Sequence, residues 1–379
     1  MSDSANDDAP RSGIGLLFAL LAGLVAVALT QLGGLVMATV LRLLDVTETS
    51  TWLAGSWLTG TALLGGWRQE VSSTLGASFG WTITAAGAPL LLTGLFWLLL
   101  GRAARRIPAP AIPGAALAGL GAALGGLLLS LASHTSVTVI NSAGSVTTTE
   151  RLPLWWTSGS RPGVVVGAFL LGAVCWLIHT RFLTAWLAIR PYLIGLLVIP
   201  GIVVAVLAGG ALAYLASNWW AILVIPMLAP LLGVSVLTAA AGAPAQVSLT
   251  RITPEPIGIW SWGDSWLAGL AGAATLVVIA VIVGLVLRRR RRRGEQVIIT
   301  VGVALSAGFI TWAQSFVLAM PEGLGAATEF TVSWWAALLI AAVMAIIATF
   351  TAGNTGAAAA SNTGPAQDSD RTTAGVQPA

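Results

Sequence analysis

Apolar runs of about 20 residues, separated by short polar connectors, constrain this chain more than any other feature of its sequence. A helix of that length crosses the hydrocarbon core of a bilayer, which is roughly 30 Å thick. Only 8% of the residues are charged, whereas a soluble domain carries about 25%. The sequence therefore predicts an all-α polytopic membrane protein with about eight transmembrane helices. The predicted spans are residues 14–40, 79–100, 112–131, 163–178, 192–215, 266–287, 297–320 and 332–350.

Two polar tails flank the predicted membrane domain, which comprises residues 13–351. Residues 1–12 are acidic and residues 352–379 are of low complexity, so both tails are predicted to be disordered and cytoplasmic. Outer loops are predicted at residues 43–78, 133–162, 242–265 and 321–331. In the second of these loops, Val and Ile alternate with Thr on both sides of Asn-Ser-Ala-Gly (141–144), which predicts a small β-hairpin.

Arginine distribution predicts the orientation, because short cytoplasmic loops of membrane proteins carry an excess of Lys and Arg. Arginines gather in the connectors 101–106, 179–190 and 288–293, which we therefore expect on the cytoplasmic side of a bacterial plasma membrane. The last connector consists of six consecutive arginines: Arg288, Arg289, Arg290, Arg291, Arg292 and Arg293. It is too short to form a domain and has no aromatic residue beside it, which argues against nucleic-acid binding. It is interpreted as a cytoplasmic anchor that contacts anionic lipid.

A ninth apolar segment, residues 219–237, conflicts with this orientation if it crosses the membrane. A full crossing would place the six arginines outside, and each arginine costs about 2.5–3.5 kcal/mol at the centre of a membrane helix. Pro226 and Pro230 each remove a backbone donor from its middle. We therefore expect a re-entrant segment that turns at these prolines. The alternative is a proline-kinked helix with a wrong boundary elsewhere.

Tryptophans cluster on the predicted outer face, where three Trp-Trp pairs each precede a segment that enters the membrane. The six residues are Trp155, Trp156, Trp219, Trp220, Trp334 and Trp335. Indole rings favour the headgroup region, so the pairs are interpreted as an aromatic belt. The alternative is a platform for a lipid, a glycan or a partner helix.

A polar stripe on the predicted helix 297–320 is the candidate intramembrane site. Thr300, Thr311 and Gln314 share one helix face with Ala304 and Ala307, and Ser306 and Ser315 lie near its edge. Gln31 in the first helix is a candidate partner for this stripe. Such uncharged groups usually form hydrogen bonds between helices, and the alternative is a path for a solute.

Small residues recur at helix-packing spacing in three of the predicted spans. They are Gly121 and Gly125, Gly163 and Gly167, and Gly201 with Ala205, Gly209 and Ala213. This pattern allows close backbone approach between helices in lipid. We expect packing within the chain, with homodimerisation as the alternative.

The types of residue that the chain contains exclude several classes of catalytic and binding site. All 18 basic residues are arginine, so the chain has no lysine for a phosphate-binding loop or a Schiff base. Cys175 is the single cysteine, and His134 and His179 are predicted on opposite sides of the membrane. The acidic residues Asp264, Glu255, Glu322 and Glu329 are expected as solvated charges of the outer loops. We expect no cofactor and no bound metal.

The Ala-, Gly- and Trp-rich layout resembles uncharacterised multi-pass membrane proteins of actinobacteria. Residues 89–106, PLLLTGLFWLLLGRAARR, are similar to the second-helix exit of a group that includes a mycobacterial division-associated membrane protein. This similarity implies no functional residue.

These features favour a non-enzymatic accessory or scaffold protein of the bacterial cell envelope, with envelope proteins or a second copy as partners. The alternative is a permease for an uncharged or lipidic solute, and an intramembrane enzyme ranks third. Internal symmetry would favour the permease, but no repeat is evident between the two halves of the sequence.

Overall fold

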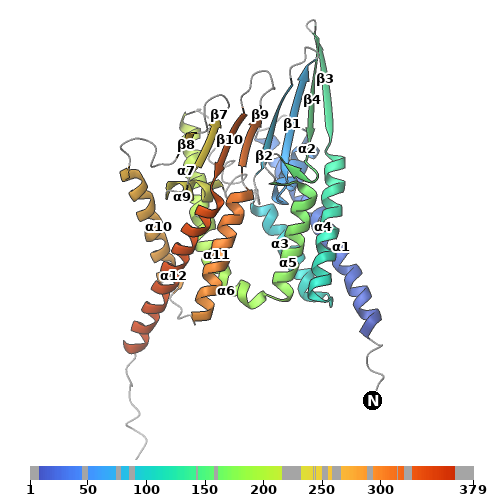
Figure 1. Ribbon diagram of the computed structural model, residues 1–379. Helices are drawn as coiled ribbons and strands as arrows, with labels where there is room; N and C mark the ends of the chain where they lie inside the picture. Colours follow the sequence, from blue (N-terminus) through green and yellow to red (C-terminus); the bar gives the residue numbers. More distant parts are fainter. Residues whose placement is uncertain are drawn as a thin grey trace, which may run out of the picture.

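The computed structural model describes residues 8–44, 50–73, 78–84, 90–141, 144–157, 161–215, 232–241, 243, 245–249, 255–257, 266–287, 293–313, 315–319 and 327–362. All described strands lie at one end of the molecule, above a layer of long helices (Figure 1). The start of α1, helix α6 and the end of α12 lie at the opposite end. We call these the strand end and the open end of the helical layer.

The helices fall into two consecutive groups. The first group is α1 (Asp8–Leu43), α2 (Thr51–Ala62), α3 (Leu90–Arg106), α4 (Ala111–Ala132) and α5 (Val164–Thr180). The second is α6 (Leu183–Leu193), which continues through the π-helical turn η1 (Ile194–Val198) into α7 (Ile199–Leu215), then α9 (Leu232–Ala240), α10 (Trp266–Leu287), α11 (Arg293–Ala313) and α12 (Trp334–Asn362). Six of these helical segments are long and apolar enough to cross a membrane, so the described chain is compatible with a multi-pass membrane protein.

Eight strands form one antiparallel sheet, in the order β3-β4-β1-β2-β9-β10-β7-β8. The strands are β1 (Gly66–Ser73), β2 (Ser78–Thr84), β3 (Thr135–Asn141), β4 (Gly144–Arg151), β7 (Ala245–Leu249), β8 (Glu255–Ile257), β9 (Ser315–Ala319) and β10 (Ala327–Val332). A second, two-strand sheet pairs β5 (Trp156–Thr157) with β6 (Arg161–Pro162). The predicted hairpin in loop 133–162 is confirmed as β3·β4, and its last pair is Asn141↔Gly144.

Several predicted boundaries are wrong, among them the starts of α1 and α6, which begin at Asp8 and Leu183 where helices were expected from residues 14 and 192. Residues 79–84 belong to strand β2, so the helix expected at 79–100 begins only at Leu90. Helix α11 ends at Ala313 and strand β9 follows, so the helix expected at 297–320 is shorter. Short apolar runs suit a buried strand as well as a helix, and hydrophobicity alone does not separate the two. At the C-terminus, α12 extends to Asn362, past the predicted boundary at residue 351.

The two groups of helices and strands are copies of one arrangement. In each half a short helix, a hairpin, two long helices, a second hairpin and a final helix follow in the same order. Adding 179 to the residue numbers of three β1·β4 pairs gives three of the β7·β10 pairs, so that Gln69↔Glu150 corresponds to Ser248↔Glu329. We call residues 8–180 half 1 and residues 183–362 half 2.

The sequence carries a faint trace of this duplication. Thr149-Glu150, followed by Trp155-Trp156, matches Thr328-Glu329, followed by Trp334-Trp335, at the same offset. In α2 and α9, Ser56-Trp-Leu-Thr59 matches Ser235-Val-Leu-Thr238. A repeat that was not evident from the sequence is therefore present in the structure. Apolar residues interchange freely on apolar helices, so that spacing and strand register survive better than residue identity.

Each half has its own core. The largest fully buried side chains of half 1 include Trp176, Phe96 and Leu100, and those of half 2 include Tyr192, Leu196 and Ile299. The clearest link between the halves is the pairing of β2 with β9 across the middle of the sheet. The helical layer therefore consists of two packed units under one continuous sheet (Figure 1).

Several of the predicted small-residue positions make contacts within the chain. Gly121 lies against the Leu20 carbonyl of α1, and Gly125 lies against Val27. Gly167 contacts the Leu63 carbonyl, which follows α2, and Gly201 lies against Gly233 of α9. These contacts support intramolecular packing for the positions concerned.

Candidate functional site

The described hydroxyls of the polar stripe predicted on α11 are buried or half-buried, and two of them bond within their own helix. Thr311 is 1% exposed, and its hydroxyl donates to the Ala307 carbonyl of the same helix at 2.8 Å. Ser306 donates in the same way to the Gly302 carbonyl at 2.7 Å, and Thr300 is half-buried. Ser315 lies in strand β9 and not on the helix, while Gln314 is outside the described residues. The stripe is therefore shorter than predicted, and these two hydroxyls bond to their own helix.

Gln31 is not a partner of this stripe, because it lies in the other half. Its Nε2 donates to the Ser56 hydroxyl of α2 at 3.1 Å, and Ser56 in turn donates to the Trp52 carbonyl at 2.9 Å. The Gln31 Oε1 atom is buried and has no partner among the described residues. Gln31 thus ties α1 to α2. The predicted bond from Gln31 to the α11 stripe is therefore wrong, and the observed acceptor is Ser56 of α2.

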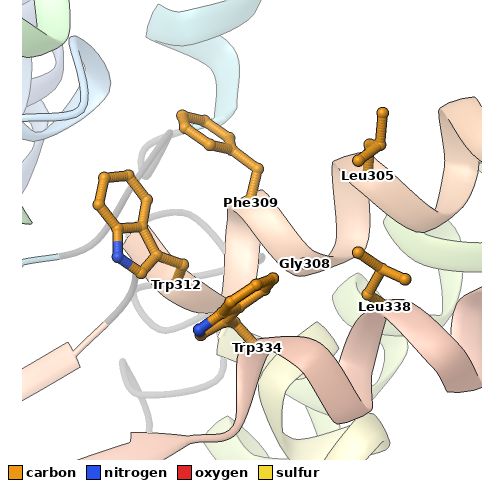
Figure 2. Close-up of a pocket in the computed structure, with 6 residues that line it drawn as sticks. All are labelled: Leu305, Gly308, Phe309, Trp312, Trp334 and Leu338. Atoms are coloured by element: carbon orange, nitrogen blue, oxygen red, sulfur yellow. The ribbon is translucent and has the colours of Figure 1, made fainter.

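A pocket of about 360 Å³ lies between α11 and α12 (Figure 2). Its lining is Leu305, Gly308, Phe309 and Trp312 from α11, and Trp334 and Leu338 from α12. Every lining side chain is apolar or aromatic. The rings of Phe309 and Trp312 lie 5.8 Å apart between centroids and form one wall. A wall of this chemistry suits a hydrocarbon chain and offers little to a polar solute.

The position of the pocket follows from the ends of its two helices. Trp312 is close to the end of α11 and Trp334 begins α12, so the pocket lies at the strand end. Leu305, Phe309 and Trp334 are 58%, 40% and 50% exposed, so the pocket opens to the surroundings of the helices.

Two features shape this pocket. Trp312 packs against the core of half 1, which places one side of the pocket beside the seam between the halves. Gly308 leaves the space open, because a Cβ atom at this position would lie only 3.2 Å from the Leu338 Cβ. Sequence reasoning did not identify the pocket, although Trp334 was singled out for the aromatic belt.

The described tryptophan pairs lie exposed at the strand end. Trp155 and Trp156 are each 59% exposed, and Trp334 and Trp335 are 50% and 53% exposed. Trp219, Trp220, Pro226 and Pro230 lie outside the described residues, as do Arg288, Arg289, Arg290, Arg291 and Arg292. Arg293 begins α11. The re-entrant segment and the arginine anchor therefore stay predictions.

Polar side chains of β1 and β4 pair on both faces of the sheet. On one face, Glu70 forms ion pairs with Arg68 on its own strand and with Arg151 on β4. On the opposite face, the Gln69 amide donates to Glu150 Oε1 at 2.9 Å. Partial burial raises the pKa of the Glu150 carboxyl, and the bond from Gln69 opposes this shift. These side chains meet only because β1 and β4 are neighbours, which the sequence did not reveal.

At the open end, Cys175 and His179 neighbour each other on α5. The His179 Nδ1 donates to the Cys175 carbonyl at 2.8 Å, and the Cys175 thiol points to the Trp97 carbonyl at 3.5 Å. His134, which follows α4, lies at the strand end. Within the described ranges no group of three His, Cys, Asp or Glu side chains could hold a metal ion.

No protein-family model, no curated protein and no solved structure matches this chain. The resemblance to actinobacterial membrane proteins stays a prediction, and function has to be argued from the geometry.

Proposed function

We propose that this protein is a non-enzymatic accessory protein of the bacterial plasma membrane that holds the hydrocarbon chain of an outer-leaflet lipid in the α11–α12 pocket. The observation that carries the proposal is the almost entirely apolar lining of a pocket that opens beside exposed apolar side chains of α11 and α12. Apolar pockets with aromatic walls are the usual environment of apolar ligands. The exposed sheet above the pocket would contact envelope components.

The proposed topology has eight crossings, with the sheet outside and both termini in the cytoplasm. The crossings are α1, α3, α4, α5, the α6–α7 segment, α10, α11 and α12. The alternation of strand end and open end along the chain supports this count, since each hairpin returns the chain to the helical layer. Arg102, Arg105 and Arg106 at the end of α3 support a cytoplasmic open end.

Cysteine labelling tests this orientation. In a Cys175→Ser background, Ser248→Cys on β7 should react with a membrane-impermeant maleimide in intact cells. Glu295→Cys, near the start of α11, should react only after permeabilisation. The reverse pattern would place the sheet in the cytoplasm and would contradict the outer-leaflet assignment.

Filling the pocket tests lipid binding. Gly308→Leu should occupy the space between the helices, so the purified protein should retain less phospholipid and gain less thermal stability when phosphatidylglycerol is added. Gly94→Leu is the matched control, because Gly94 is exposed on α3 and a Cβ there would meet nothing within 4 Å. Equal lipid retention by Gly308→Leu and the unmodified protein would refute the site.

The duplication favours a second candidate, a permease for an uncharged or lipidic solute. Parallel structural repeats are common in transporters, which move one repeat against the other. Reconstituted vesicles separate the two functions. Lipid binding without transfer of a fluorescent phospholipid between leaflets favours the accessory role, whereas transfer that Gly308→Leu abolishes favours the permease.

A further inference from the structure

Strand β3 forms one edge of the sheet and lacks the features that usually protect an edge strand. Its sequence, Thr-Ser-Val-Thr-Val-Ile-Asn, contains neither a charged residue nor proline. Val137, Val139 and Ile140 are 60%, 59% and 81% exposed. Natural edge strands are usually short, charged, interrupted by proline or covered, because free backbone groups attract another strand. β3 is therefore an open edge.

The hairpin register shows which backbone groups are free. Two residues separate the last pair, Asn141↔Gly144, and the closing pair of a two-residue hairpin exchanges its backbone hydrogen bonds. Since bonded and non-bonded pairs alternate, the N–H and C=O groups of Ser136, Thr138 and Ile140 point away from β4. The close hydroxyl contacts of Ser136 with Thr149 and of Thr138 with Thr147 fit non-bonded pairs. The backbone N–H and C=O groups of these three β3 residues can therefore bond to another strand.

The strand of half 2 that corresponds to β3 shows which kind of strand can pair with this edge. β9 holds the same place in half 2 as β3 holds in half 1, since each follows the second long helix and begins the second hairpin. β9 is covered by β2, which pairs with it antiparallel from Gly80↔Ala319 to Thr84↔Ser315. β2 has the sequence Ser-Phe-Gly-Trp-Thr-Ile-Thr, carries no charge and runs back toward the helical layer. Among the strands that the structure describes, none takes this role beside β3.

A second copy of the chain offers no suitable strand. The opposite edge, β8, contains Pro256 opposite Gln246. Because proline has no N–H, this pair cannot exchange both bonds with β7, so the Pro256 backbone faces outward without a donor. Two β3 strands in one membrane would both run away from the helices and would have to pair in parallel. Every pairing in this sheet is antiparallel.

We propose that β3 binds, by strand addition, an uncharged extended segment of another envelope protein that runs antiparallel to β3, toward the membrane. In such complexes backbone hydrogen bonds supply affinity, and side chains of alternate residues supply specificity. The partner segment should be rich in β-branched and aromatic residues, as β2 is. This inference rests on the proposed accessory role in one respect, which is that the partner is an envelope protein.

A fluorescent peptide with the β2 sequence, SFGWTIT, serves as the probe for the purified full-length protein in detergent. The unmodified protein should bind it saturably. Thr138→Pro removes an outward N–H and leaves the β4 ladder intact, so affinity should fall by at least about tenfold, the equivalent of one lost hydrogen bond. Thr138→Val keeps the N–H and is the matched control, with affinity expected within about threefold of the unmodified protein.

The same samples supply the outcomes that would overturn the proposal. Absence of saturable binding, or equal affinity for Thr138→Pro, would exclude β3 as the acceptor. A dimer by light scattering that Thr138→Pro converts to a monomer would identify a second copy as the occupant, against the proposal. Should Thr138→Pro fail to fold, a peptide methylated at every amide nitrogen tests the unmodified protein and should not bind. Phospholipid retained in these samples reports separately on the α11–α12 pocket.

Discussion

Half 1 and half 2 share an order of elements and a strand register, yet their helices pack differently. The most apolar stretch of α4 is 56% buried, whereas that of its counterpart α11 is 33% buried. Gly23 and Gly121 bring α1 and α4 into backbone contact in half 1. At the same offset of 179, half 2 has Ile202 and Thr300.

This difference shows that one architecture can serve two purposes. Glycine contacts exclude lipid and make half 1 a closely packed unit, as expected for small residues at membrane helix interfaces. In half 2 the larger side chains keep the helices further apart, so a smaller share of α11 is buried. The pocket beside Gly308 lies between α11 and α12. The comparison predicts a structural half 1 and a ligand-binding half 2.

The largest effect is expected where half 1 packs most closely. Gly121→Val should prevent folding or destabilise the protein by more than about 3 kcal/mol, because its Cβ would overlap the Leu20 carbonyl, which is backbone and cannot rotate away. Thr300→Val, at the corresponding place in half 2, should cost less than about 1 kcal/mol. Thermal unfolding in detergent measures both. Similar losses from the two changes would refute the difference in packing.

Proline substitutions in β9 and in β3 compare a strand that is covered on both sides with a strand that has one free edge. Val317→Pro in β9 removes a donor that either β2 or β10 uses, so we expect a loss of about 2–3 kcal/mol. Thr138→Pro in β3 should lower the melting temperature much less, because its N–H faces the free edge. A larger loss from Thr138→Pro than from Val317→Pro would show that β3 is already covered.

The Gln31–Ser56 pair of half 1 is not repeated in half 2, where Gly210 corresponds to Gln31. Ser56→Ala should cost about 1–2 kcal/mol, because the buried Gln31 amide loses its acceptor. Ser235→Ala should cost less, since Gly210 occupies the position corresponding to Gln31. The double change Ser56→Ala with Gln31→Leu should recover part of the loss in thermal stability. If it does not recover any, the Ser56 hydroxyl stabilises α2 by another route.

The smallest effect concerns the sheet above half 1. The raised pKa of Glu150 means that folding disfavours its charged form, so this group costs stability once the pH rises through its folded pKa. Glu150→Gln should therefore raise the melting temperature slightly at pH 7. This gain should vanish below about pH 4, where the carboxyl is protonated in both states. A gain that persists at low pH would rule out ionisation as its cause.

The sequence was sufficient for the long apolar helices, which are compatible with a multi-pass membrane protein, and for the hairpin at 141–144. These depend on the length and periodicity of apolar runs, which are local properties. The spacing of small residues also indicated Gly121 as a packing position, whereas the partner expected for Gln31 was wrong. Strands β2 and β9 were missed because each is a short apolar segment directly beside a helix, and local hydrophobicity does not separate the two states.

Tertiary structure alone decided the eight-strand sheet and the pocket, and it made the duplication evident. Each depends on which segments become neighbours: β1 beside β4, β2 beside β9, and Gly308 beside Leu338. No local pattern encodes these pairings, because backbone ladders form between any two strands whose edges meet. The amino-acid sequence determined the long apolar helices and where the chain can turn, whereas contacts between distant segments determined which edge was left open.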